Sequence, residues 1–495
     1  MAFLTIHLGH RFARIEFDAP QPLYRLLAQA DIPLAQPCGG HGMCGKCAVT
    51  ISGSVSEPNA AENHCGVRLA CQAAITGDAE VRLPTILPMV NIEGGSASDL
   101  IPIAPMQGRF GAAVDIGTTT IALLLYDLQS GRCIGSASML NPQTSVAADV
   151  IGRIDAAMHG QADKLRQQVA SAIMTMLASA CANAGVLTEQ IESLVTTGNT
   201  TMLYLLTGRD PSALSRAPFQ ADFLFAQETI LFGRNAYLPQ CLHAFVGADT
   251  TCALLASGMI ETNETSLLCD VGTNGELTLW HHGDLYIAST AAGPAFEGAG
   301  ISCGCASIPG AIDRVEIMDG ELCCHTIGDA APVGICGSGL LDAIASLLEI
   351  EALDGTGFLE NGTVQLARNV RLTQADIRAV QLAKGATYAG IMSLLKAANC
   401  GLSEVKTLHL AGGFGSHLNI RSAVRIGLIP AALADQVRVI GNAALDGAAH
   451  LLMNTNARSR ISAIENTVQH VRLDGNPTFS TLYIESMLFD VEDDS

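Results

Sequence analysis

The sequence predicts a multidomain α/β protein in which a small α+β unit precedes a larger, two-lobed α/β unit. Three observations support this. The chain has 495 residues, 49% of them hydrophobic, which is enough for two or more domains with buried cores. From residue 109 onward, short apolar strands alternate with long helical segments. A strand, Asp-x-Gly-Thr turn, strand pattern occurs twice, with its aspartates at Asp115 and Asp270, which predicts two related halves.

The small unit is predicted over residues 1–84. Residues 3–8 (FLTIHL) and 11–17 (RFARIEF) read as two strands joined by a glycine-containing turn, which favours a hairpin. Residues 21–30 have apolar positions at helical spacing. Two further strands are expected at residues 47–53 and 79–84, so the strands should surround one helix.

Residues 85–108 are predicted to be a linker because prolines, a Gly-Gly pair and serines interrupt any regular period. The larger unit is then predicted over residues 109–485, with its first half at about 109–264 and its second at about 265–485. Residues 441–452 (GNAALDGAAHLL) predict a late helix whose small side chains permit close helix packing.

A loop rich in cysteine and glycine lies in the small unit. Cys38, Cys44 and Cys47 have the spacing C-x5-C-x2-C, and Cys71 follows in an apolar stretch. Four thiolates of which three share one loop are the ligand set of a [2Fe–2S] cluster. Glycines in the loop allow the tight curvature that turns backbone N–H groups toward the sulfur atoms. A structural zinc site is the alternative, although zinc sites favour paired C-x2-C units, and Cys65 is a fifth candidate ligand.

Both Asp-x-Gly-Thr turns are candidate phosphate loops. In each, glycine lets the backbone approach an anion, and N–H and hydroxyl groups can hold it. The aspartates Asp115 and Asp270 are placed to hold Mg²⁺ or its waters. A third glycine-rich stretch, residues 409–419, can lie against an adenosine. The candidate nucleotide-binding residues are Gly117, Thr118, Thr119, Gly272, Thr273, Asn274, Gly412, Gly413, Phe414 and Gly415.

Two other residues have open alternatives. Glu276 either positions water for hydrolysis or is an ordinary carboxylate at a strand end. Lys384 either reaches the nucleotide or a subunit interface, or is a solvated lysine. The chain contains no G-x-x-x-x-G-K-[ST] motif, so a Walker-type loop is not the expected route to ATP.

Charge and hydropathy exclude several classes of partner. The net charge is −20, so we expect no nucleic-acid partner, because phosphate-backbone binding needs a basic surface. No apolar run of about eighteen residues and no signal-peptide pattern are found, so we expect no membrane association. We therefore expect a cytoplasmic protein whose cysteines stay mostly reduced.

These motifs carry resemblances to known families. The cysteine loop resembles that of plant-type and adrenodoxin-type ferredoxins. The three glycine motifs, in this order, resemble the acetate and sugar kinase, heat-shock 70 and actin superfamily. Together with residues 198–202 (GNTTM), 334–342 (GICGSGLLD) and 381–386 (QLAKGA), nearly the whole chain resembles the reductive activators of corrinoid proteins. The resemblance implies a β-grasp ferredoxin domain followed by an actin-like ATPase domain with duplicated RNase H-like halves.

The resemblance also implies a function. We expect ATP-dependent one-electron reduction of an inactive Co(II) corrinoid protein to Co(I), in support of corrinoid-dependent methyl transfer. The implied cofactors are a [2Fe–2S] cluster, ATP and Mg²⁺, and the implied partners are the corrinoid protein and an upstream low-potential electron donor. The superfamily favours a homodimer. The alternatives are an activator of another low-potential metalloenzyme and a small-molecule kinase with a regulatory cluster.

Overall fold

The computed structural model describes residues 2–8, 11–30, 32, 47–65, 67–83, 98–412 and 418–489. Among these residues, no helix combines the length and the apolar character needed to cross a bilayer. Among the described residues, those up to 83 and those from 98 to 489 form separate sheets with separate cores.

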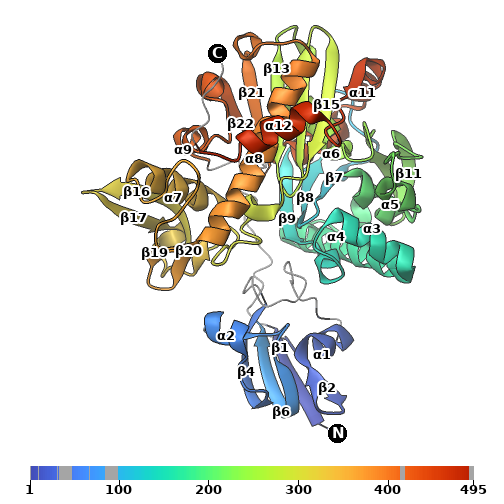
Figure 1. Ribbon diagram of the computed structural model, residues 1–495. Helices are drawn as coiled ribbons and strands as arrows, with labels where there is room; N and C mark the ends of the chain where they lie inside the picture. Colours follow the sequence, from blue (N-terminus) through green and yellow to red (C-terminus); the bar gives the residue numbers. More distant parts are fainter. Residues whose placement is uncertain are drawn as a thin grey trace.

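The N-terminal part is a mixed sheet with two short helices (Figure 1). Its strands are β1 (Ala2–Leu8), β2 (Arg11–Phe17), β3 (Gln21–Pro22), β4 (Ala48–Val55), β5 (Arg68–Leu69) and β6 (Ala74–Leu83), and its helices are α1 (Leu23–Gln29) and α2 (Ala60–Cys65). The order is β2-β1-β6-β4-β5, with β1 parallel to β6 and antiparallel to β2. Alternate residues Leu4 and Ile6 on β1 are fully buried and pack with Leu23 and Leu27 of α1. The predicted hairpin, helix and later strands are confirmed.

The next sheet has the order β11-β12-β10-β7-β8-β9. Its strands are β7 (Phe110–Ile116), β8 (Thr120–Asp127), β9 (Cys133–Leu140), β10 (Ile191–Gly198), β11 (Gln227–Leu231) and β12 (Arg234–Leu238). The helices of this half are α3 (Val150–Ala156), α4 (Ala162–Ala184), α5 (Thr200–Thr207) and α6 (Ala248–Ser257). Strands β7, β8 and β9 form an antiparallel meander, and β10 lies parallel to β7.

A third sheet repeats this topology in the order β22-β21-β13-β14-β15-β23. Its strands are β13 (Ser266–Val271), β14 (Gly275–His281), β15 (Asp284–Thr290), β21 (Thr407–Ala411), β22 (Val437–Gly441) and β23 (Val468–His470). Again the first three strands form a meander, β21 lies parallel to β13, and β22 lies parallel to β21. The internal repeat predicted from the two Asp-x-Gly-Thr turns is therefore confirmed as two sheets of the same design.

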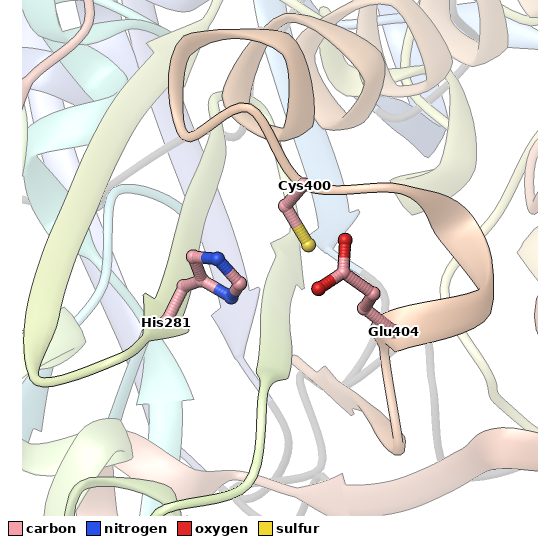
Figure 2. A group of neighbouring side chains, drawn as sticks. All are labelled: His281, Cys400 and Glu404. Carbon is pink, nitrogen blue, oxygen red and sulfur yellow. The ribbon is translucent and has the colours of Figure 1, made fainter.

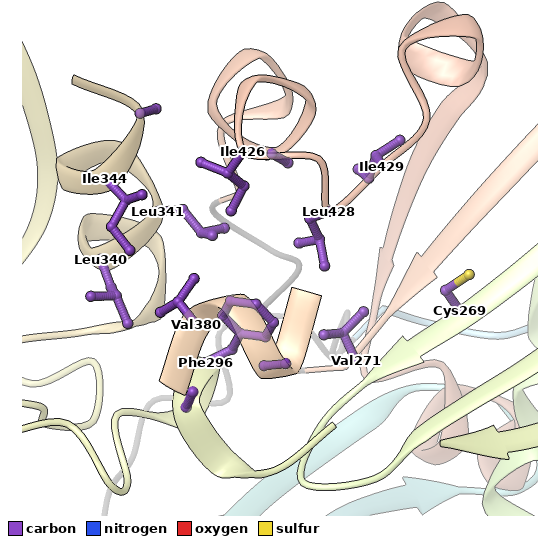
Figure 3. Close-up of a cluster of buried hydrophobic side chains, with 14 of the residues drawn as sticks. Cys269, Val271, Phe296, Leu340, Leu341, Ile344, Val380, Ile426, Leu428 and Ile429 are labelled. Atoms are coloured by element: carbon purple, nitrogen blue, oxygen red, sulfur yellow. The ribbon is translucent and has the colours of Figure 1, made fainter. Parts of the chain in front are cut away.

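The remaining elements belong to the second half in sequence. Some lie beside the third sheet, and the gold-coloured group at the left of Figure 1 lies to one side of it. The helices are α7 (Gly337–Glu349), α8 (Gln374–Ala397), α9 (Ile420–Arg425), α10 (Ala443–Met453), α11 (Arg458–Ile464) and α12 (Pro477–Glu485). The small strands are β16 (Ala311–Met318), β17 (Glu321–Thr326), β18 (Gly334–Ile335), β19 (Thr363–Ala367) and β20 (Val370–Thr373). Figure 3 shows part of the core, in which Phe296 lies near Val380 of α8 and Leu340 of α7. This packing fixes the loop that ends at Glu297.

Helix α10 packs on the first half although it belongs to the second half in sequence. It lies against α6, β7 and β10. The contact is backbone to backbone, because a Cβ atom built on Gly447 would lie 1.9 Å from the carbonyl oxygen of Cys252. The predicted helix with small residues is thus confirmed. Residues 98–108, the end of the predicted linker, lie beside α10, where Met106 N donates to the carbonyl of Leu452 at 2.9 Å.

Candidate functional site

The turn between β7 and β8 is tightly closed by hydrogen bonds. Gly117 N donates to the carbonyl of Thr120 at 2.9 Å, and a Cβ atom on Gly117 would lie only 2.7 Å from that oxygen. Asn141 Nδ2 donates to the Gly117 carbonyl at 2.9 Å, and Asn199 Nδ2 donates to Thr118 Oγ1 at 3.1 Å. Glycine is therefore required at position 117, and two asparagines from neighbouring elements hold the turn in place.

One carboxylate joins the two predicted phosphate loops. Thr119 Oγ1, in the β7–β8 turn, donates to Glu297 Oε2 at 2.8 Å. Thr273 Oγ1, in the β13–β14 turn, donates to Glu297 Oε1 at 2.9 Å. Glu297 ends the short 3₁₀ helix Pro294–Glu297. The structure thus brings the two loops, more than 150 positions apart in the sequence, to opposite sides of one anionic group.

Several carboxyl groups gather behind these loops. Burial, together with the nearby charge of Asp249, raises the pKa of Asp115 to about 8. Burial and Asp249 likewise raise the pKa of Asp270 to about 7. Glu276 has a pKa well above the ordinary glutamate value for the same two reasons. Burial also raises the pKa of Asp249 itself to about 6. Crowded, partly buried carboxylates of this kind are stabilised when a divalent cation lies among them.

Two further residues fix the aspartates. Asn442 Nδ2 donates to Asp115 Oδ2 at 3.2 Å, while its own Oδ1 caps α10 by accepting from Leu445 N at 2.9 Å. Gly412 has φ +96°, and a Cβ atom there would lie 2.8 Å from Asp270 Oδ1. Any side chain at position 412 would therefore be strained and would displace Asp270. The other three residues of the predicted adenosine motif, Gly413, Phe414 and Gly415, lie outside the described residues.

The remaining predicted loop residues, Gly272 and Asn274, lie in the β13–β14 turn, where a Cβ atom on Gly272 would be 3.4 Å from Glu297 Oε1. Sequence reasoning missed Asp249 and Glu297. Asp249 lies in the first turn of α6, where an acidic residue is common for helix stability alone. Glu297 lies in a short loop segment with no motif of its own. In the sequence, neither Asp249 nor Glu297 can be distinguished from an acidic residue that has no role in a site.

In the N-terminal sheet, two of the predicted cluster ligands come from adjacent segments. Cys47 is buried directly before β4, and Cys71 is half-buried shortly after β5. Ala70 N donates to the Cys47 carbonyl at 2.9 Å, which holds the two segments together. Cys38 and Cys44 lie outside the described residues. The donor set that is described, two cysteines from adjacent segments, is the kind that iron–sulfur clusters use.

Lys384 is neither a solvated lysine nor free to reach a nucleotide. It is completely buried on α8, where its Nζ donates to the carbonyl of Leu488 and lies 5.3 Å from the centroid of the Phe489 ring. On the same helix, Gln381 Nε2 donates to the Met487 carbonyl at 2.7 Å. The segment QLAKGA, which is part of α8, therefore holds residues 487–489, called the C-terminal segment below, against this helix.

Comparisons with known proteins agree with this architecture. Residues 10–76 match the family model of the 2Fe–2S iron–sulfur cluster binding domain, which supports an iron–sulfur cluster rather than zinc. Residues 110–262 match the RACo middle region, and residues 264–495 match the C-terminal domain of RACo, described as the ASKHA domain.

Two curated relatives and one solved structure are similar over most of the chain. A corrinoid activation enzyme of Eubacterium limosum is 34% identical over 81% of this chain and 74% of its own length. A Co(II) methylated amine-specific corrinoid protein reductase of Methanosarcina barkeri is 25% identical over 76% of each chain. The solved structure of a reductive activator for a corrinoid, iron–sulfur protein superposes with a TM-score of 0.72 and 26% identity, over 99% of this chain and 98% of the other. The chain belongs to the family of reductive activators of corrinoid proteins.

Proposed function

We propose that this protein is an ATP-hydrolysing oxidoreductase that reduces the inactive Co(II) form of a corrinoid protein to Co(I). The observation that carries the proposal is the joining of two phosphate-type loops by Glu297 in a chain of this family. Each reduction transfers one electron from the cluster to the corrinoid, and an upstream low-potential donor then re-reduces the cluster. ATP is hydrolysed to ADP and phosphate in the same cycle.

The proposed cluster ligands are Cys38, Cys44, Cys47 and Cys71. When bound, a [2Fe–2S] cluster supplies one-electron transfer. The residues of this chain determine how exposed the cluster is: Cys47 is 2% exposed, whereas Cys71 is only half-buried. Of the two described cysteines, Cys71 is therefore the more exposed to solvent.

The proposed Mg–ATP site is formed by the two loops and the carboxylates behind them. Asp115 and Asp270 would hold Mg²⁺ or its waters, because burial and the neighbouring carboxylate of Asp249 raise their pKa values and a divalent cation among them would stabilise their charged forms. The hydroxyls of Thr119 and Thr273 already donate to an anion, the Glu297 carboxylate. That carboxylate stands in for a phosphate group, since both offer oxygen acceptors to the same pair of donors.

This arrangement gives ATP a means of coupling the two halves. Phosphate oxygens that replaced the Glu297 carboxylate at both threonine hydroxyls would make the contact between the halves depend on the nucleotide, and this contact would change on hydrolysis. A ligand shifts an equilibrium between open and closed halves toward closure only if it binds the closed state better than the open one. We propose that the closed state is the one that docks the corrinoid protein.

The proposal is tested by separating the two activities. The Cys44→Ala variant should lose Co(I) formation while binding ATP as the unaltered protein does, because all the proposed nucleotide residues belong to residues 109–485 of the sequence. The matched control is Cys65→Ala, which changes a cysteine near the loop that is not among the four proposed ligands. Full Co(I) formation by Cys44→Ala would show that the cluster is not the electron donor, and loss in Cys65→Ala alone would reassign the fourth ligand.

A further inference from the structure

A second group of potential metal ligands lies at one end of the third sheet. Among the described residues, His281, Cys400 and Glu404 each offer one ligand atom, and these atoms all lie within 4.8 Å of one another. Figure 2 shows the three side chains directed toward a common space. His281 is the last residue of β14, whereas Cys400 and Glu404 lie in the connection between α8 and β21. Two segments more than 100 positions apart in the sequence thus meet here through their ligand-type side chains.

The histidine and the glutamate are already held by neighbouring groups. His281 Nδ1 is 2.8 Å from Thr265 Oγ1, so a proton on Nδ1 leaves the lone pair of Nε2 available. Metal-binding histidines usually engage their second ring nitrogen in this way. Glu404 Oε1 accepts from Gly401 N at 2.8 Å, which orients the carboxylate. His281 is 7% exposed and Cys400 is 8% exposed, whereas Glu404 is exposed, so the site has two buried ligands and one on its open side.

The mixture of ligand atoms selects a class of metal. Magnesium and calcium favour sets made entirely of oxygen atoms, whereas one imidazole nitrogen, one thiolate and one carboxylate suit zinc and related divalent transition metals. Three protein ligands leave a fourth position for water or another small ligand.

We propose that His281, Cys400 and Glu404 bind one divalent transition-metal ion, zinc first among them, at a site separate from the nucleotide loops. The β13–β14 loop, which Glu297 joins to the β7–β8 loop, follows the far end of β13, whose six residues from Ser266 to Val271 span about 20 Å. Because Cys400 follows α8 closely, the ion would tie the end of that helix to β14. Helix α8 also holds the C-terminal segment through Lys384, so the ion would stabilise this whole side of the second half.

The test measures zinc in the full chain carrying its iron–sulfur cluster. The protein is incubated with Zn²⁺, freed of unbound metal by gel filtration, and analysed for zinc and iron in the same sample. We expect about one zinc per chain in the unaltered protein, and loss of this zinc in Cys400→Ser and Glu404→Gln with iron unchanged. Thr265→Val should weaken zinc affinity about 10- to 100-fold, because Thr265 orients the histidine without binding metal.

The matched control is Cys181→Ser, which alters a buried cysteine of α4 in the first half and should keep its zinc. Zn²⁺ should also raise the Tm of the unaltered protein and of this control, but not that of Glu404→Gln. Glu404 is exposed, so this variant stays informative even if Cys400→Ser folds poorly. Zinc no higher than in a chelator-treated blank, or zinc retained by both ligand variants, would overturn the proposal.

Discussion

Replacing Gly447 by alanine should force α10 away from α6. The added Cβ atom would lie 1.9 Å from the carbonyl oxygen of Cys252 and 2.4 Å from its carbonyl carbon. Ordinary contacts between such atoms are near 3.5 Å, so the two helices must separate by about 1.5 Å. The obstruction is helix backbone, which cannot rotate out of the way as a side chain can.

The expected magnitude is the difference between two opposing effects. Alanine in a helix interior is favoured over glycine by about 1 kcal/mol. Overpacking a tight interface costs about 1–3 kcal/mol, and more when backbone must move. We therefore expect a net loss of about 2 kcal/mol, which lowers the Tm by roughly 4 °C in a domain of this size. Because Asn442 begins α10 and donates to Asp115, ATP binding should weaken as well.

Thermal unfolding and ATP binding are measured for Gly447→Ala beside Gly385→Ala. Gly385 also lies inside a helix, but its built Cβ atom is 3.3 Å from the Ser486 carbonyl oxygen, a contact that needs only a small adjustment. The control should therefore keep its Tm or gain from helix propensity. An unchanged or raised Tm in Gly447→Ala would refute the close packing of α10 on α6.

Three other predictions follow from the site and its surroundings. Burial raises the pKa of Asp446 to about 7, above the ordinary value of 3.8, so the folded state retains a proton that the unfolded chain has lost between these pH values. The free energy of unfolding should therefore fall as pH rises from about 4 to 7. Asp446→Asn should remove this fall and raise the free energy of unfolding by at most about 4 kcal/mol at pH 8, measured by denaturation at each pH. A difference between the two proteins that does not vary with pH would contradict this. Asp249→Asn should slow ATP hydrolysis roughly 100-fold, measured as phosphate release, since the Asp249 carboxylate acts electrostatically on both Asp115 and Asp270. Unchanged turnover would exclude Asp249 from the site. Lys384→Met should release the Leu488 carbonyl and expose the C-terminal segment to proteases, with a cost of about 2 kcal/mol, whereas unchanged proteolysis would show that the segment is held by other contacts.

Local sequence patterns were sufficient for the repeated parts of the fold. The two apolar runs and the glycine-containing turn in residues 3–17 predicted the β1–β2 hairpin, and the two Asp-x-Gly-Thr turns predicted the β7–β8 and β13–β14 hairpins, because strand and turn chemistry are local properties. The small residues around Gly447 likewise predicted a closely packed helix. These strand, turn and small-residue patterns can be recognised without knowing which distant segment each element packs against.

The parts of the site that sequence reasoning missed depend on distant partners. Glu297 matters because it meets Thr119, 178 positions earlier, and Asn442 matters because it meets Asp115, 327 positions earlier. A single carboxylate or amide carries no local pattern that reveals such a contact. Lys384 was misjudged for the same reason, since its burial depends on a segment 104 positions away. The ligand roles of Cys38 and Cys44 stay predictions from their spacing.

The central claim is that ATP makes the corrinoid reducible by this protein. The most direct measurement mixes the anaerobic, reduced full chain with a Co(II) corrinoid protein and follows the Co(I) absorption band with and without Mg–ATP. The account predicts that Co(I) accumulates only when Mg–ATP is present and hydrolysed. Equal accumulation of Co(I) without ATP would contradict it.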